Sequence, residues 1–130
     1  MIVPTVKSQL ATLDRDCIKT LYNFIDAASY MQLQDNEFWE LVEQKLVDEG
    51  QHRYLKLDEL ASVLKGLSYV GRGSDELLEI IEKTFIKHRK ALTPEIIDDA
   101  REGFQRINKG SEILFRVLEN PEVELPALEA

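Results

Sequence analysis

Two stretches of this chain repeat one pattern without a gap. DAASYMQLQDNEFWELVEQKLV, at 26–47, overlies KGLSYVGRGSDELLEIIEKTFI, at 65–86, with an offset of 39 positions throughout. A serine, a tyrosine and three glutamates are identical, and many other positions are conservative in character, such as Met31 with Val70, Asn36 with Asp75 and Leu41 with Ile80. A third copy appears when 55–78 is laid over 92–115 with an offset of 37. A period of this length is typical of two-helix units that pack side by side, because each unit alone buries only part of its apolar surface.

Each copy predicts a helix, a short turn and a second helix. In the middle copy Gly71 and Gly73 mark the turn, since glycine readily adopts the left-handed backbone that ends a helix. Ser74 then caps the next helix, and the same place is held by Ser111 in the third copy and by Asp35 in the first. The apolar stripe of the first helix has a spacing of three and four residues. Its members are Leu57, Leu60, Ala61, Leu64, Leu67 and Ser68.

The second helix of each copy carries adjacent apolar pairs, which widen its buried arc beyond one stripe. We therefore predict an all-α fold, a short α-solenoid of about three stacked helix-turn-helix hairpins. Residues 1–119 form this single domain, with hairpins near 14–49, 56–89 and 94–119, and residues 120–130 form an extended acidic tail. The predicted helices lie near 14–31, 35–49, 56–71, 74–89, 94–108 and 111–119.

The charge balance favours protein partners with basic patches. The net charge is -8 and the isoelectric point is about 4.8, so binding to nucleic acid is not expected. The single cysteine, Cys17, rules out an intrachain disulfide and a cysteine metal cluster. We expect no transmembrane segment and recognise no presequence, so any membrane contact should come only through partners.

No group of residues predicts catalysis or metal binding. The loop at 48–59 has the length of a calcium loop, but Gly50, His52 and Arg53 stand where oxygen ligands and a turn glycine are needed. His52 and His88 lack a second ligand at helical spacing, and no nucleophile stands beside a base. We therefore expect a protein that is not an enzyme and has no cofactor, with no catalytic, cofactor-binding or metal-binding residues.

Partner binding is the expected work of the chain, and the end faces of so short a stack should be partly apolar. Aromatic residues at interfaces commonly anchor a partner, and the apolar residues of the tail could dock in a partner's groove. The candidate partner-binding residues are Trp39, Tyr54, Val123, Leu125 and Leu128.

The stretches LKGLSYVGRGSDELLEIIEKTF and DAASYMQLQDNEFWELVEQKL resemble the octotricopeptide-like and FAST-kinase-type (heptatricopeptide-like) helical repeats of organellar proteins. The resemblance covers about 14–119 and implies a short, degenerate member. It implies a scaffold or accessory subunit of a large mitochondrial assembly: a respiratory-chain complex, the ATP synthase or the mitoribosome. Two alternatives remain, an organellar RNA-binding factor and a cytosolic, degenerate EF-hand-like regulatory module.

Overall fold

The computed structural model of the chain describes residues 18–123, and this part of the chain is all-α. It contains six α-helices and no β-strand. The six helices correspond one to one with the predicted helices, and residues 14–17 of the first predicted helix lie outside the described residues. The helices are α2 (Ile18–Tyr30), α3 (Asn36–Glu43), α4 (Leu57–Val70), α5 (Asp75–Lys87), α6 (Pro94–Arg106) and α7 (Glu112–Glu119).

Four helices, α3, α5, α6 and α7, begin at a capping side chain, and three of these caps, Asp35, Ser74 and Ser111, are the ones that the repeat predicts. In each case a side-chain oxygen accepts a hydrogen bond from the backbone N–H three residues later, which satisfies a donor that the first turn leaves open. Gly71 ends α4 with a left-handed backbone, φ 70°. The capping pairs are Asp35 with Phe38, Ser74 with Leu77, Thr93 with Ile96 and Ser111 with Leu114, at 3.1 to 3.2 Å.

The segments that follow α3 and α5 are more irregular than the sequence predicts. The predicted helix at 35–49 is α3 followed directly by a π-helical turn, Gln44–Asp48. Gly50, with φ 67°, then turns the chain into a 3₁₀-helix, Gln51–Tyr54. A second short 3₁₀-helix, Arg89–Ala91, connects α5 to α6. These two connections account for the loops between hairpins.

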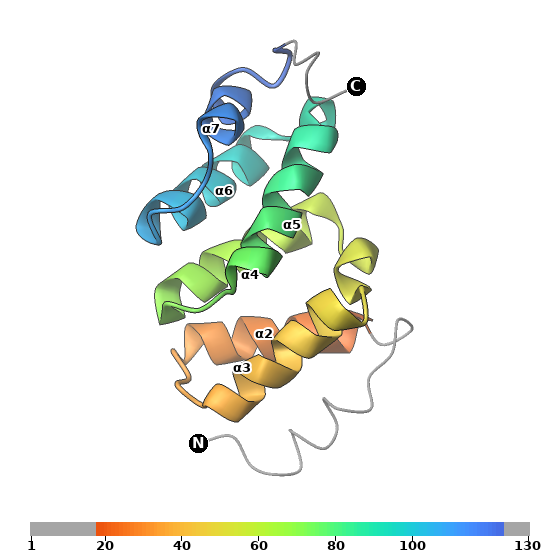
Figure 1. The fold of residues 1–130 in the computed structure, drawn as a ribbon, viewed down its shortest axis with the longest axis vertical. Helices are drawn as coiled ribbons and strands as arrows, with labels where there is room; N and C mark the ends of the chain where they lie inside the picture. Colours follow the sequence, from red (N-terminus) through yellow and green to blue (C-terminus); the bar gives the residue numbers. More distant parts are fainter. Residues whose placement is uncertain (1–17, 124–130) are drawn as a thin grey trace.

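The helices lie in two layers (Figure 1). Helix α4 packs between α2 and α6, while α3, α5 and α7 lie in front of them in this view. The backbones of the rear layer approach closely at two glycines. A methyl group on Gly66 would lie 2.5 Å from Ser29 Oγ, and one on Gly103 would lie 2.8 Å from Leu64 Cγ. Gly66 and Gly103 occupy the same place in the repeat, but Ser29 aligns with Ser68 and not with Leu64, so the two glycines meet the preceding helix at points four residues apart.

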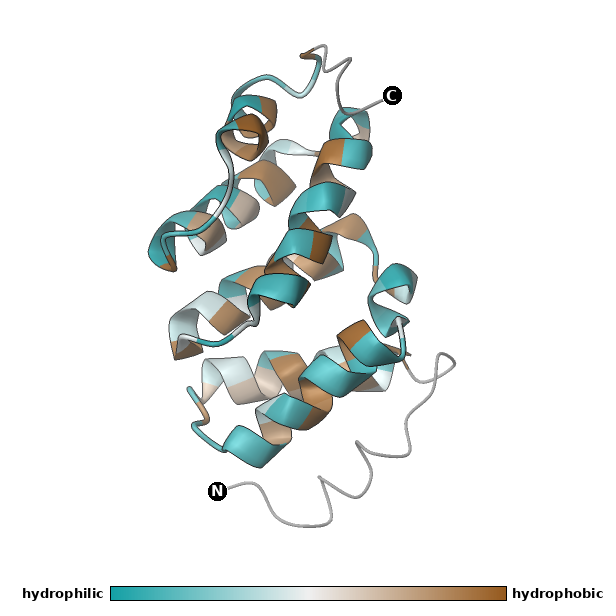
Figure 2. Ribbon diagram, in the orientation of Figure 1, coloured by the Kyte–Doolittle hydropathy of each residue, from teal (hydrophilic) through white to brown (hydrophobic). Residues whose placement is uncertain are grey.

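One hydrophobic cluster joins the two layers, and Figure 2 shows hydrophobic and hydrophilic patches alternating along α3 and α5. Phe38, Phe85 and Phe104 are completely buried in it, one from each hairpin. Burying a side chain of this size contributes about 1.5–3 kcal/mol.

None of the helices within residues 18–123 has the length and hydropathy needed to cross a bilayer. After α7 the backbone at Asn120 is extended, but the chain then turns, and Val123 N–H donates to Asn120 O at 3.0 Å. The predicted extended tail therefore begins with a turn. Residues 124–130 lie outside the described residues.

Candidate functional site

The three hairpins meet at two junctions, and both junctions contain the same hydrogen-bonded clamp. The first junction lies between hairpins α2–α3 and α4–α5, and the second lies between hairpins α4–α5 and α6–α7. At the first junction Ser74 donates to the Glu43 carboxylate through its backbone N–H, at 2.9 Å, and its hydroxyl, at 2.8 Å. At the second junction Ser111 makes the same two bonds to Glu82, at 3.0 and 2.9 Å. Because these residues align in the repeat, the clamp is a repeated feature of the sequence.

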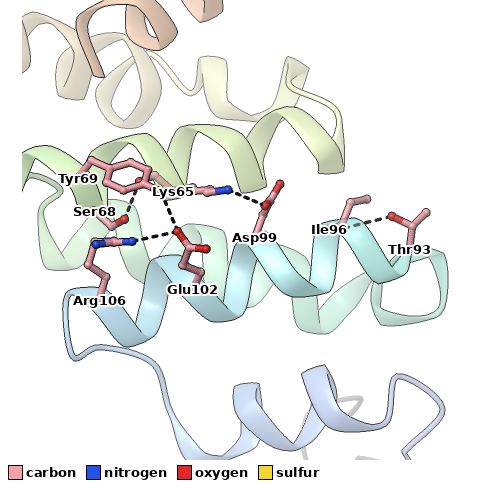
Figure 3. Close-up of polar contacts among 8 residues, drawn as sticks. All are labelled: Lys65, Ser68, Tyr69, Thr93, Ile96, Asp99, Glu102 and Arg106. Carbon is pink, nitrogen blue, oxygen red and sulfur yellow. Dashed lines mark hydrogen bonds and ion pairs between the residues drawn. The ribbon is translucent and has the colours of Figure 1, made fainter. Parts of the chain in front are cut away.

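The second junction is also closed by a polar cluster between α4 and α6 (Figure 3). Lys65 Nζ lies 3.3 Å from Asp99 Oδ1, and the Tyr69 hydroxyl donates to Glu102 Oε2 at 2.9 Å. The guanidinium of Arg106 donates to the same Glu102 oxygen at 3.0 Å and stacks 4.2 Å from the centre of the Tyr69 ring. The Tyr69 and Arg106 hydrogen bonds lower the pKa of Glu102, and the contact with Asp99 raises the pKa of Lys65.

The front layer of the second junction is closed as well. Lys109, in the turn between α6 and α7, pairs with Asp75 at 3.1 Å. In the first junction the corresponding residues are Arg72 and Asn36, and an asparagine offers no charge to a guanidinium. The first junction therefore lacks this ion pair.

The first junction has a groove on each layer. In front, the acidic groove has a volume of about 540 Å³ and lies between α3 with its π-helical turn and the α4–α5 turn. In the rear layer, the tyrosine groove, of about 440 Å³, lies between α2 and α4. The acidic groove is lined by Asn36, Trp39, Glu40, Val42, Glu43, Gln44, Val47, Asp48, Leu67, Arg72, Gly73, Ser74 and Glu76. The tyrosine groove is lined by Asp26, Ala27, Ser29, Tyr30, Met31, Ser62, Lys65, Gly66 and Tyr69.

At the other end of α2 the first junction is tied by an ion pair. Lys19 Nζ donates to Glu59 Oε2 at 2.7 Å, and the backbone N–H of Lys56 donates to Glu59 Oε1 at 2.9 Å. Burial alone would raise the pKa of Glu59, but the hydrogen bonds from Lys19 and Lys56 outweigh it and lower the pKa. Helices α2 and α4 are therefore held at this end and leave a groove at the other.

The two end faces of the rear layer differ, and the expectation of two partly apolar end faces holds for one only. On α4, the face that packs against α6 carries three buried residues. In α6 all three places are polar, and the Asp98 side chain is 77% exposed. A polar outer face is what terminal units of helical repeats need in order to stay in water. The matched residues are Ala61 with Asp98, Leu64 with Arg101, and Ser68 with Gln105.

The outer face of α2 carries two exposed apolar residues, Ala27 and Met31, at the end that also borders the tyrosine groove. Thr20 and Asn23 make the rest of this face polar. Gly66, half-buried on α4, and Val70, buried on α4, correspond on α2 to Ala27 and Met31, and Met31 is 62% exposed. Tyr30 is 90% exposed beside them. The sequence prediction of binding residues missed these three, although the overlay of the repeats contains the signal. Two positions that face the preceding hairpin on α4, those of Gly66 and Val70, are apolar again on α2, although no hairpin within the described residues precedes α2.

The predicted partner-binding residues are placed very differently from one another. Trp39 is a core residue, 3% exposed, whose indole N–H donates to Leu33 O at 2.8 Å. Tyr54 is partly exposed at the end of its 3₁₀-helix. Val123 packs against the protein's own core, and its carbonyl accepts from Arg89 Nε at 3.1 Å. Leu125 and Leu128 lie outside the described residues. The structure does not bring these residues into one site.

The loop that resembles a calcium loop is occupied by other contacts. The carboxylate of Glu59 is bound by Lys19 and by the Lys56 N–H, as described above, and His52 Nδ1 lies 2.9 Å from Leu46 O. Within residues 18–123 no group of three histidine, cysteine, aspartate or glutamate side chains is placed to hold a metal ion. Arg89, which follows α5, donates to Ile86 O at 3.0 Å and so satisfies a carbonyl at the end of that helix.

The residues with interaction potential are therefore concentrated at the first junction and on the outer face of α2. A comparison with the models of known protein families and with curated protein sequences found no match.

Proposed function

We propose that the protein is a non-catalytic interaction module, a short α-solenoid of three stacked hairpins that binds partner proteins through its first hairpin. The observation that carries this proposal is the exposed apolar pair on the outer face of α2. Ala27 and Met31 are exposed at the places where Gly66 of α4 is half-buried and Val70 of α4 is buried. Exposed apolar patches of this kind mark surfaces that bury against another molecule.

The polar face of α6 makes the two ends of the rear layer unequal as binding surfaces. Because Asp98, Arg101 and Gln105 close that end, a partner helix that extends the rear layer binds beside α2 and not beside α6. Tyr30 adds an exposed aromatic ring, a residue type that is enriched where interfaces gain most of their binding free energy.

The setting we propose is that of a small accessory subunit in a large mitochondrial assembly. The resemblance of the repeats to those of organellar proteins supports a mitochondrial location, and the net charge of -8 suits neighbours with basic surfaces. The respiratory-chain complexes, the ATP synthase and the mitochondrial ribosome are the assemblies to examine, in that order.

The test is the native mass of the tagged protein in a gentle lysate of its own cells, with organelles fractionated. We expect the wild type to migrate in a mitochondrial particle far heavier than the 15.0 kDa chain. The double variant Ala27→Glu, Met31→Glu should migrate as the free chain, whereas Gln105→Glu, on the polar face of α6, should behave as the wild type. A wild type that is free and cytosolic would overturn the proposal.

A further inference from the structure

The acidic groove of the first junction combines an apolar floor with an acidic rim. Three of its apolar residues are almost completely buried and one is half-buried, so the floor belongs to the hydrophobic core. A volume of about 540 Å³ lies within the range of pockets that take a ligand of drug size. The floor residues are Trp39, Val42, Leu67 and Val47.

The charges around the rim are strongly unequal. Four carboxylates, those of Glu40, Glu43, Asp48 and Glu76, surround the groove, and Arg72 is the cation among its lining residues. Glu43 is engaged by Ser74 in the clamp. The other three carboxylates are exposed and make no hydrogen bond or ion pair with other described residues. An excess of uncompensated negative charge therefore faces the solvent above an apolar floor.

The second junction shows what the first one lacks. There a lysine in the turn between helices, Lys109, neutralises an acid at the start of the preceding front helix, Asp75. At the first junction Asn36 replaces that acid, and Arg72 has no ion pair with any described residue. The repeat thus closes one junction with its own cation and leaves the other with three carboxylates that a second molecule can neutralise.

We propose that the acidic groove binds a basic segment of a partner protein, in which an arginine or lysine stands next to an apolar side chain. The cation would pair with the rim carboxylates, and the apolar neighbour would lie on the floor beside Trp39. Complementary charge accelerates and orients such an encounter, and contact with the apolar floor adds affinity that does not depend on charge. The net charge of the whole chain, -8, acts in the same direction.

This inference rests on the proposed function, because it assumes that protein partners bind. Its test uses the purified protein and a synthetic peptide, so its failure is distinguishable from a failure of the native-mass experiment. The probe is a fluorescein-labelled peptide of alternating arginine and leucine. The comparison peptides alternate glutamate with leucine and arginine with serine.

The single tryptophan of the chain, Trp39, lies on the floor and reports directly on occupancy of the groove. Fluorescence anisotropy measures binding, and tryptophan fluorescence, measured with unlabelled peptide, locates it. We expect the arginine–leucine peptide to bind and to change the Trp39 emission, the arginine–serine peptide to bind more weakly, and the glutamate–leucine peptide not to bind. Tight binding that leaves the Trp39 emission unchanged would overturn the proposal, as would equal binding of the glutamate–leucine peptide.

A matched pair of variants separates the groove from general charge attraction. Glu40→Gln with Glu76→Gln removes two rim charges, and Glu95→Gln with Glu119→Gln removes two charges from α6 and α7. Each pair takes one acid from the first turn of a helix, so their effects on helix stability are similar. We expect about tenfold weaker binding for the groove pair and less than about twofold for the other pair. Equal losses in the two pairs would overturn the proposal.

Discussion

The two junctions of this molecule are built from the same repeated sequence and differ in how completely they are closed. Both have a glycine at the closest approach of the rear helices, and both have a glutamate that binds the capping serine of the next hairpin. At the second junction Glu102 accepts hydrogen bonds from Tyr69 of α4 and from Arg106 of its own helix, and Lys109 forms an ion pair with Asp75. At the first junction their counterparts leave two grooves. The comparison shows that a repeat can keep its clamp and its interface glycine while a few side chains change the surface of the junction.

The strongest test of the comparison is Gly103→Val. The valine side chain would meet Leu64, whose Cγ is 2.8 Å and whose backbone carbon is 3.4 Å from a methyl group at this position. Because α4 and α6 would have to separate, we expect a loss of about 3 kcal/mol in the free energy of unfolding, measured with denaturant.

The matched control is Ala27→Val, at the same place in the repeat on the exposed face of α2. The valine has space there, so a change of less than about 0.5 kcal/mol is expected. Similar losses for the two variants would show that Gly103 is not at a tighter interface than Ala27.

The clamp is tested by Glu82→Ala, which removes both hydrogen bonds to Ser111. Hydrogen bonds to a carboxylate are stronger than neutral ones, so we expect a loss of about 2 kcal/mol. Thermal and denaturant unfolding would both measure it.

Glu119 provides the control, because it aligns with Glu82 and no described hairpin follows it. Glu119→Ala should change the free energy of unfolding by less than about 0.5 kcal/mol. If the clamp contributes nothing to stability, Glu82→Ala and Glu119→Ala will have the same free energy of unfolding.

Acid should loosen both junctions through different residues. The folded-state pKa values of Glu102 and Glu59 lie below the ordinary value of 4.5, so their contribution is complete above that pH and is lost as pH falls through the folded values. We expect hydrogen-exchange protection in α4 and α6 to fall below pH 4.5. Glu102→Gln should reduce that acid response in α6 and leave the response of α2, which depends on Glu59, unchanged.

The smallest expected effect comes from making the first junction resemble the second. Asn36→Asp places an acid where Asp75 stands in the next repeat and gives Arg72 the partner that Lys109 has. An exposed ion pair of this kind contributes about 0.5 kcal/mol. A rise in the unfolding midpoint that disappears in high salt would identify the pair, and an unchanged midpoint would mean that Arg72 does not reach it.

Much of the fold follows from local signals in the sequence. Asp35, Ser74, Thr93 and Ser111 cap helices because their side chains bond the first turn, and such bonds depend only on neighbouring residues. The π-helical turn after α3 was not predicted, since apolar spacing does not distinguish it from a regular turn. The polar outer face of α6 was also not predicted. The overlay contains the signal, because the buried Ser29 and Ser68 align with the longer side chain of Gln105 in the last unit, which is exposed.

The candidate site was harder to predict because it depends on contacts between residues far apart in the chain. Trp39 and Tyr30 are both large aromatic residues of the kind that anchor partners, but Trp39 is buried and Tyr30 is exposed. What separates them is which neighbouring helix covers each ring. That depends on the positions of the helices and cannot be read from residue type.

The clamp also bears on how chain length can vary in this molecule. Its two ends are 31 residues apart at the first junction and 29 at the second, yet the bond lengths agree within about 0.1 Å. The difference lies in the connections between hairpins, which run from Glu43 to the start of α4 at Leu57 and from Glu82 to the start of α6 at Pro94. Connections of different length are therefore compatible with the same clamp, because the glutamate and its serine meet in the same way at both junctions.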